Sequence, residues 1–266
     1  MSTKKTGYAD INGLHLYYEI HGSGEPLIVL HGGFGSVEMF GPNIELLAKT
    51  RQVIGVDLQG HGRTADIDRP MSAEALGDDV AALIQHLGFE KADVMGYSLG
   101  GAAALQAAIR HPERIRKLVL VSTAFARSGW FPEVRAGFDA IGPQLAAMMK
   151  QGPAYAFYEK IAPRPQDFER VVEKVGAMVK QDYDWSALIT DKLPPTLIVA
   201  GDADGLRPTH LVEMYAKLGG GQRDPGWDGS AGRSKSQLAI LPGKTHYDIV
   251  ASPTLAATVE PFLASR

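Results

Sequence analysis

A buried strand and a closely packed helix are both predicted within residues 92–110, which read ADVMGYSLGGAAALQAAIR. The short run Ala92–Met95, apolar apart from Asp93, is typical of a strand that is covered on both faces. Residues 99–110 have the small and apolar side chains of a helix that packs against a sheet. We expect this helix to end at His111-Pro112, because a residue before proline disfavours the helical conformation. A strand followed so directly by a helix indicates an α/β fold.

Ser98 lies at the tip of the turn between this strand and this helix, within Gly96-Tyr97-Ser98-Leu99-Gly100. A turn this sharp strains the backbone of the residue at its tip, for which we expect a positive φ. Side chains two residues before and after the serine would collide, and Gly96 and Gly100 avoid that collision. The N-terminus of the helix also directs partial positive charge toward the hydroxyl. We therefore predict that Ser98 is a catalytic nucleophile.

A serine nucleophile needs a base to take its proton, and the base needs a carboxylate to orient it. Asp202 and Asp204 follow one later predicted strand, and His246 follows the last one. The chain order Ser98, Asp204, His246 is expected when side chains gather at the carboxyl ends of parallel strands. Asp202 is nearer the strand end, where it could cap the turn. Asp204 is favoured as the acid because it lies further into the loop.

The other histidines are predicted to have structural or surface roles. His31 and His61 lie in glycine-rich loops near the predicted site and are interpreted as scaffold. The remaining ones are His15, His21, His86, His111 and His210.

The glycine-rich loop His31–Gly35 follows the first buried strand and can offer free backbone N–H groups to a developing oxyanion. The N–H of Leu99, directly after the nucleophile, is the predicted partner donor. The donor from the loop is Gly33 or Phe34, and Gly33 is favoured. Losing one such donor costs ~3–4 kcal/mol of transition-state stabilisation. The residues predicted to contact substrate are Phe34, Tyr97 and Trp130.

Strand and helix signals alternate along the rest of the chain. Asn12-Gly13 predicts a type I′ turn that joins strands Tyr8–Ile11 and Leu14–Ile20 into a hairpin. A helix is predicted from Ser72 to Leu87, with Ser72 as its N-cap. The further predicted strands are Leu27–Leu30, Val53–Val56, Ala92–Met95, Leu118–Val121, Thr196–Ala200 and Leu238–Leu241. This order predicts an α/β fold with a mostly parallel, twisted sheet and helices on both faces.

One long interval has no strand-like run. Residues 125–193 contain helix-length pieces separated by prolines and are rich in aromatic residues and methionine. We interpret them as a helical cap, inserted into a core domain made of residues 1–124 and 194–266. A second irregular stretch, Gly219–Ser236, is predicted to be a surface loop.

Composition sets limits on function. The 266 residues are 45% hydrophobic and 21% charged with a net charge of −3, which is typical of a globular chain and offers no basic field for nucleic acid. The chain has no cysteine, which excludes thiolate catalysis and disulfides. It has no signal-peptide pattern and no apolar run long enough to insert into a membrane, so a cytoplasmic location is expected.

Together these residues resemble the α/β-hydrolase superfamily over nearly the whole chain. Asp57–Thr64 looks like the family's Asp-x-x-Gly-x-Gly-x-Ser loop, with Thr64 in the place of serine. The glycine-rich loop before the last strand is similar to a branch of bacterial esterases that includes pyrethroid-type carboxylesterases and acyl-homoserine lactonases. Ser98 stands where epoxide hydrolases and haloalkane dehalogenases have aspartate, which disfavours those activities.

The resemblance implies a carboxylic ester hydrolase with a Ser98–His246–Asp204 triad and an oxyanion hole at Gly33 and Leu99. Its partner would be a small-molecule ester or lactone, and no metal or organic cofactor is implied. A carbon–carbon bond hydrolase and a perhydrolase would use the same triad. A ligand-binding signalling protein with slow turnover is the alternative from another class. The oligomeric state is left open.

Overall fold

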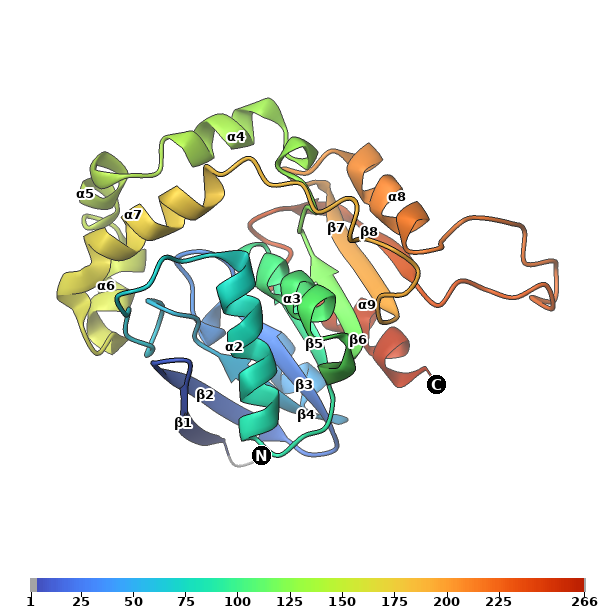
Figure 1. Ribbon diagram of the computed structural model, residues 1–266, viewed down its shortest axis with the longest axis horizontal. Helices are drawn as coiled ribbons and strands as arrows, with labels where there is room; N and C mark the ends of the chain where they lie inside the picture. The colour runs from blue at the N-terminus through green and yellow to red at the C-terminus, as the bar shows by residue number, and fades with distance from the viewer. Residues whose placement is uncertain (1–3, 266) are drawn as a thin grey trace.

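An eight-stranded sheet forms the centre of the computed structural model, which describes residues 4–265 (Figure 1). The strand order is β1-β2-β4-β3-β5-β6-β7-β8. β2 runs antiparallel to both of its neighbours, and the other neighbouring pairs are parallel. The strands are β1 (Lys5–Ile11), β2 (Leu14–Gly22), β3 (Glu25–Leu30), β4 (Arg51–Val56), β5 (Ala92–Tyr97), β6 (Ile115–Val121), β7 (Thr196–Ala203) and β8 (Gln237–Thr245).

The predicted N-terminal hairpin is confirmed. Asn12 and Gly13 have φ values of 47° and 81°, the two positive values that a type I′ turn requires. The turn leaves β1 and β2 in register from Ile11 opposite Leu14 to Lys5 opposite Ile20. The hairpin forms one edge of the sheet, away from the predicted catalytic strand β5.

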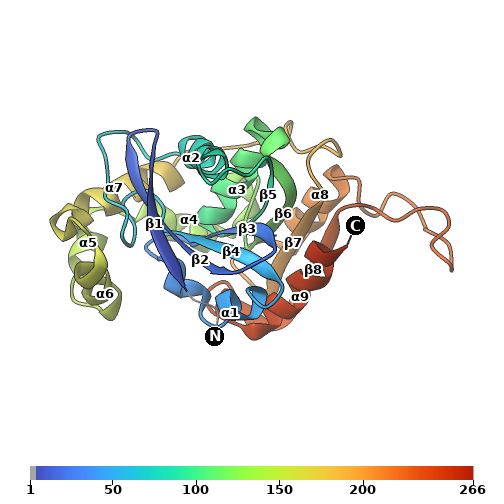
Figure 2. The same cartoon turned by 90° about the horizontal axis from the view of Figure 1, so that it is seen from below.

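Helices cover both faces of the sheet, as apolar strands such as Leu27–Leu30 predicted (Figure 2). Along β3, Leu27 and Val29 point to the face covered by α1 (Asn43–Leu47) and α9 (Pro253–Ala264). Ile28 and Leu30 point to the opposite face, which is covered by α2 (Ala73–His86), α3 (Leu99–Arg110) and α8 (Pro208–Lys217). The side-chain alternation of a strand thus divides one run of apolar residues between two cores.

The two helices predicted in detail form as expected. Ser72 caps α2, where its Oγ accepts a hydrogen bond from the N–H of Ala75 at 3.1 Å. α3 has the predicted bounds and ends before Pro112. Short 3₁₀ helices lie at Val37–Phe40, Pro112–Arg114, Arg127–Gly129 and Pro165–Asp167.

Residues 125–193, here called the helical insertion, lie between β6 and β7 and arch over one side of the sheet (Figure 1). Their helices are α4 (Pro132–Asp139), α5 (Pro143–Met149), α6 (Pro153–Ile161) and α7 (Phe168–Val179). The prolines that interrupt the sequence begin α4, α5 and α6, a position where a missing N–H costs nothing. Val171 and Val175 of α7 join the main core. The division into a core domain and a cap domain stays a prediction.

The structure lengthens several predicted strands and leaves one segment irregular. β7 continues to Ala203, three residues beyond the predicted end, so Asp202 lies inside the strand instead of in the loop after it. Residues 219–236 form no helix or strand and project from the body of the molecule (Figures 1 and 2). Trp227 within them is 100% exposed. Among residues 4–265, every helix lacks the length and apolarity needed to cross a membrane.

Candidate active site

The turn between β5 and α3, here called the elbow, has the strained geometry that its sequence predicts. Ser98 has φ 52° and ψ −114°, outside the regions that ordinary residues prefer. A Cβ on Gly96 would lie 2.1 Å from the carbonyl oxygen of Gly100, and one on Gly100 would lie 2.4 Å from that of Leu30. Only glycine fits at these two positions, because the contacting atoms belong to the backbone.

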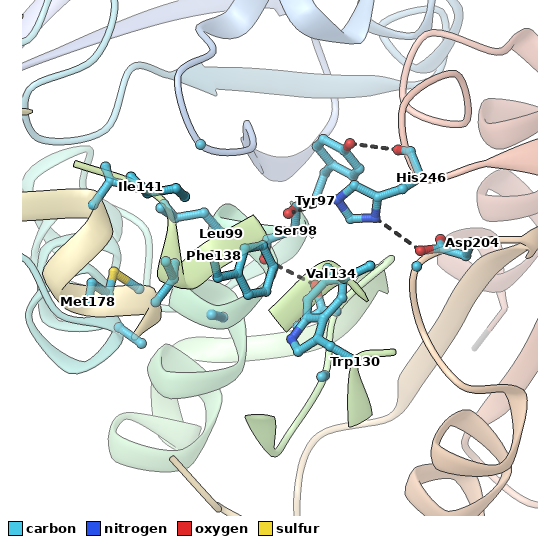
Figure 3. Close-up of a pocket in the computed structure, with 18 of the residues that line it drawn as sticks. Tyr97, Ser98, Leu99, Trp130, Val134, Phe138, Ile141, Met178, Asp204 and His246 are labelled. Carbon is cyan, nitrogen blue, oxygen red and sulfur yellow. Dashed lines mark hydrogen bonds and ion pairs between the residues drawn. The ribbon is translucent and has the colours of Figure 1, made fainter. Parts of the chain in front are cut away.

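Three predicted side chains meet at the carboxyl ends of the strands (Figure 3). Ser98 Oγ lies 3.1 Å from His246 Nε2, and His246 Nδ1 lies 3.0 Å from Asp204 Oδ1. Since a carboxylate oxygen can only accept, Nδ1 carries the proton and Nε2 is free to accept one from Ser98. The imidazole is therefore in the tautomer that a general base for Ser98 requires.

Asp204 is held as a carboxylate by two side chains. Burial disfavours its charged form, but hydrogen bonds from His246 and from Ser122 outweigh burial and lower the pKa of Asp204 below its ordinary value. Ser122 Oγ donates to Asp204 Oδ2 at 2.5 Å. Sequence reasoning missed Ser122, although the signal was available: it directly follows β6, whose end lies beside the end of β5.

Asp202, the alternative acid, makes a different contact. Its Oδ1 accepts the N–H of Lys244 at 3.2 Å, near the end of β8 and two residues before His246. Its side chain is exposed, whereas Asp204 is 8% exposed. Asp202 therefore joins the carboxyl ends of the parallel strands β7 and β8, a structural role in keeping with its position near the strand end.

Tyr97 lines the predicted site but also holds it together. Its hydroxyl donates to the carbonyl oxygen of His246 at 2.6 Å. Burial, and then the charge of Asp204, raise the pKa of Tyr97, so the hydroxyl stays protonated and remains a donor. Most of its ring lies in the core on the α1 and α9 face. Of the three residues predicted to contact substrate, Tyr97 is thus the one that is hydrogen-bonded to the backbone of His246.

The two predicted oxyanion donors are neighbours. A Cβ on Gly33 would lie 3.7 Å from Leu99 Cδ1, and both residues line the same cavity as Ser98. Leu99 is the first residue of α3, so its N–H has no acceptor within the helix. The N–H of Gly35 donates to Gly32 at 3.2 Å and closes a turn around Gly33 and Phe34. This turn holds the backbone of Phe34 at a positive φ of 59°.

His31 and His61 lie in the scaffold beneath this turn. His31 Nε2 accepts the N–H of Leu58 at 3.0 Å, and His61 Nδ1 donates to the carbonyl of Gln59 at 2.8 Å. Burial lowers the pKa of both imidazoles to about 4, so they are neutral near neutral pH. Neither is hydrogen-bonded to Ser98. In the Asp57–Thr64 loop, Thr64 Oγ1 donates to the carbonyl of Asp57 at 2.6 Å.

A cavity of about 660 Å³ opens beside Ser98, under the helical insertion. Phe34, Tyr97 and Trp130 all line it. The indole N–H of Trp130 donates to Tyr183 Oη at 2.9 Å, and its ring stands edge-on to His246 at 5.4 Å. Further apolar residues that line the cavity are Val134, Phe138, Ile141, Val175, Met178 and Val179.

Metal ligands do not gather in the part of the chain that the structure describes. There, no group of three or more histidine, aspartate or glutamate side chains is arranged to hold an ion.

Comparisons with known proteins agree with this architecture. The chain is 30% identical to a protein of Azorhizobium caulinodans assigned as carbamate hydrolase RutD, over 79% of this chain and 85% of that protein. It is 37% identical to 2-hydroxymuconate semialdehyde hydrolase of Pseudomonas sp. strain CF600, over 51% of this chain and 49% of that protein. The crystal structure of the enol-lactonase from Burkholderia xenovorans LB400 superposes with a TM-score of 0.70 at 22% identity, covering 97% of this chain and 100% of that one.

The family model described as alpha/beta hydrolase fold matches residues 25–168, which include β3, the elbow at Ser98 and the first helices of the insertion. The match spans more than half of the chain. The protein is a member of the α/β hydrolase family.

Proposed function

We propose that this protein is a serine hydrolase that cleaves carboxylic esters, lactones among them, through an acyl-enzyme intermediate. The observation that carries the proposal is the continuous chain of contacts from Ser98 Oγ to His246 and from His246 to Asp204, at 3.1 and 3.0 Å. These distances are within reach of direct proton transfer. Ser98 also lines a large cavity whose wall is mostly apolar, which suits an ester with an apolar acyl group.

The first half-reaction would acylate Ser98. His246 Nε2 takes the hydroxyl proton while Oγ forms a bond to the ester carbonyl carbon. The negative charge that develops on the carbonyl oxygen would be bound by the N–H groups of Gly33 and Leu99. When the tetrahedral intermediate collapses, the carbon–oxygen bond to the alcohol breaks and His246 returns the proton to that alcohol.

The second half-reaction would release the acid. Water enters in place of the alcohol, gives a proton to His246 and adds its oxygen to the acyl carbon. Collapse of this second intermediate breaks the bond to Ser98, and the hydroxyl recovers its proton from His246. Asp204 holds the imidazole in the required tautomer throughout and stabilises its transient positive charge.

Hydrolysis of a carbon–carbon bond is the second candidate, because a relative is named 2-hydroxymuconate semialdehyde hydrolase. It would use the same Ser98 and His246. A panel with aryl esters, lactones and a dienone substrate separates the two candidates by their ratio of kcat/KM values.

The central test is a series of 4-nitrophenyl esters of increasing acyl length, assayed with wild type and with Ser98→Ala. Short and medium esters should be hydrolysed, and Ser98→Ala should lose at least ~10³-fold in kcat. Ser128→Ala is the matched control, because Ser128 is an exposed serine outside the cavity. Incubation with a 4-nitrophenyl phosphonate should add one phosphonyl mass to wild type but not to Ser98→Ala. Undiminished turnover in the Ser98 variant would contradict the proposal.

A further inference from the structure

The charged side chains on the cavity wall are nearly all acidic. Three carboxylates line it, those of Glu74, Glu133 and Asp204. Asp204 is committed to His246 and Ser122, but Glu74 and Glu133 have no such partner among the lining residues. Of the described residues that line the cavity, none is lysine or arginine, and His246 is the sole histidine. The wall therefore offers no fixed cation to a bound anion.

Two cations of the helical insertion bind backbone oxygens of residues that line the cavity. The guanidinium of Arg127 donates to the carbonyl of Val179 at 3.4 Å and to Asp139 at 2.6 Å. Lys180 Nζ donates to the carbonyl of Ile141 at 2.7 Å. Val179 and Ile141 line the cavity, but Arg127 and Lys180 are not among the lining residues. These cations therefore contact backbone oxygens of the wall residues and do not themselves line the cavity.

Two neutral donors on the wall are occupied. The indole N–H of Trp130 donates to Tyr183, and Thr123 Oγ1 donates to the carbonyl of Ser98 at 3.2 Å. Gly33 and Leu99 also have backbone N–H groups, which the proposed reaction needs for the oxyanion. The hydroxyls of Ser72, Tyr183 and Tyr247 and the side-chain amide of Gln181 belong to the wall as well, but these donors carry no charge. A substrate carboxylate in this cavity would exchange its water for uncharged donors, with no lysine or arginine of the lining residues to pair with, which is unfavourable.

We propose that the cavity selects esters whose acyl group is uncharged and rejects esters that carry a carboxylate on it. This specificity rests on the proposed ester hydrolysis and goes beyond it. Glu74 and Glu133 are its specificity-determining residues, because they add like-charge repulsion to the loss of hydration. The same wall weighs against a muconate as substrate, since a muconate carries a carboxylate.

The acidic side chains of the wall should also affect release of the product. Hydrolysis turns a neutral ester into a carboxylate inside the cavity, where Glu74 and Glu133 oppose its retention. Product release is thereby favoured, and the free acid should be a weak inhibitor of the hydrolysis of the neutral ester.

Three substrates of matched length test the proposal near neutral pH. These are 4-nitrophenyl hexanoate, 4-nitrophenyl methyl adipate and mono-4-nitrophenyl adipate. The first two are neutral, and the third carries a carboxylate at the end of its acyl chain. We expect kcat/KM for the monoanion to be on the order of 100-fold below that for the methyl adipate. The methyl adipate has the same acyl chain and a polar terminal group but no charge.

Charge-reversal variants identify the source of the discrimination. Glu133→Lys should raise the kcat/KM of the monoanion relative to that of the methyl ester by about fivefold or more at low salt. Glu173→Lys makes the same change at an exposed position of α7 outside the cavity and should leave this ratio within about twofold. The difference should shrink in ~0.5 M salt, because Glu133 is exposed and its field is screened.

The two proposals fail in different ways. If the monoanion and the methyl ester are hydrolysed within about threefold of each other, or if both lysine variants change the ratio equally, charge selection is overturned. That outcome leaves ester hydrolysis by Ser98 standing. If Ser98→Ala retains turnover of all three esters, the ester hydrolase function itself is overturned.

Discussion

Ser122 Oγ donates a hydrogen bond to Asp204 Oδ2 at 2.5 Å, across 82 positions of the chain. Ser122 has a φ of 52°, so the backbone after β6 is held in the left-handed region at this point. A residue other than glycine is strained in that conformation. The strain and the hydrogen bond occur at the same residue, which indicates that the serine is kept there for its hydroxyl.

Replacing Ser122 should separate the effect of its hydrogen bond to Asp204 from the effect of its backbone strain. Ser122→Ala and Ser122→Gly both leave Asp204 Oδ2 without its donor, so each should lower kcat by roughly tenfold. The loss should be accompanied by a rise in the pKa of Asp204, seen as an acid limb of the kcat profile displaced to higher pH. Ser122→Gly should unfold at a higher urea concentration than Ser122→Ala, because glycine tolerates the positive φ. Equal acid limbs in wild type and both variants would argue that the hydroxyl has no part in positioning Asp204.

The two aspartates near the end of β7 should differ sharply. Asp204→Asn removes the acceptor that fixes the tautomer of His246, and kcat should fall by ~10⁴-fold. Asp202→Asn is the natural control, because its exposed side chain contacts only the N–H of Lys244. It should lower kcat by less than about threefold. Steady-state assays of both proteins on one neutral ester decide the assignment, and a larger loss at Asp202 would reverse it.

The crowding at the elbow predicts a stability difference between two glycines. Gly96→Ala would place a methyl carbon 2.1 Å from the carbonyl oxygen of Gly100, so the variant should lose ~3 kcal/mol or more of unfolding free energy. Gly137→Ala, in α4, meets nothing within 4 Å and should gain up to ~1 kcal/mol from helix propensity. Urea unfolding of the two variants measures both changes. An elbow that accepts alanine without cost would be inconsistent with the geometry of Ser98.

Buried neutral histidines predict that the fold weakens in mild acid. Burial lowers the pKa of His210 from its ordinary value of about 6.5 to about 4, and its Nε2 accepts the N–H of Phe125. Below pH 6.5 the unfolded chain therefore takes up a proton that the folded chain refuses until about pH 4. Stability is fully present above this window and is lost as the pH falls through it, by roughly 3 kcal/mol for this group.

Unfolding free energy measured between pH 4 and 6.5 should thus rise with pH, and His210→Gln should reduce the slope. His31 and His61 act in the same direction, so part of the slope should remain. The exposed His86 provides the control variant, His86→Gln. A slope that is the same in wild type and His210→Gln would show that His210 is not the responsible group.

Much of the fold could be predicted because its signals are local. The φ values of Asn12 and Gly13 follow from two adjacent residues, and the bounds of α3 follow from Pro112 and from the small residues after Ser98. Strand ends were less certain, as β7 shows, since hydrogen bonds to a neighbouring strand extend a strand beyond its apolar run. Ser98, Asp204 and His246 could be proposed together because each lies within a few residues of the carboxyl end of a predicted strand.

The sequence by itself determined the strand–turn–helix at Ser98, the alternation of strands and helices, and the absence of cysteine chemistry, since each depends on the identity of residues close together in the chain. Only the tertiary structure decided that Ser122 supports Asp204, that Tyr97 holds the His246 loop, and that carboxylates without a fixed cation line the cavity. These relationships join residues many positions apart. Their distances are fixed by how the strands pair and how the helical insertion packs over them, which no local pattern specifies.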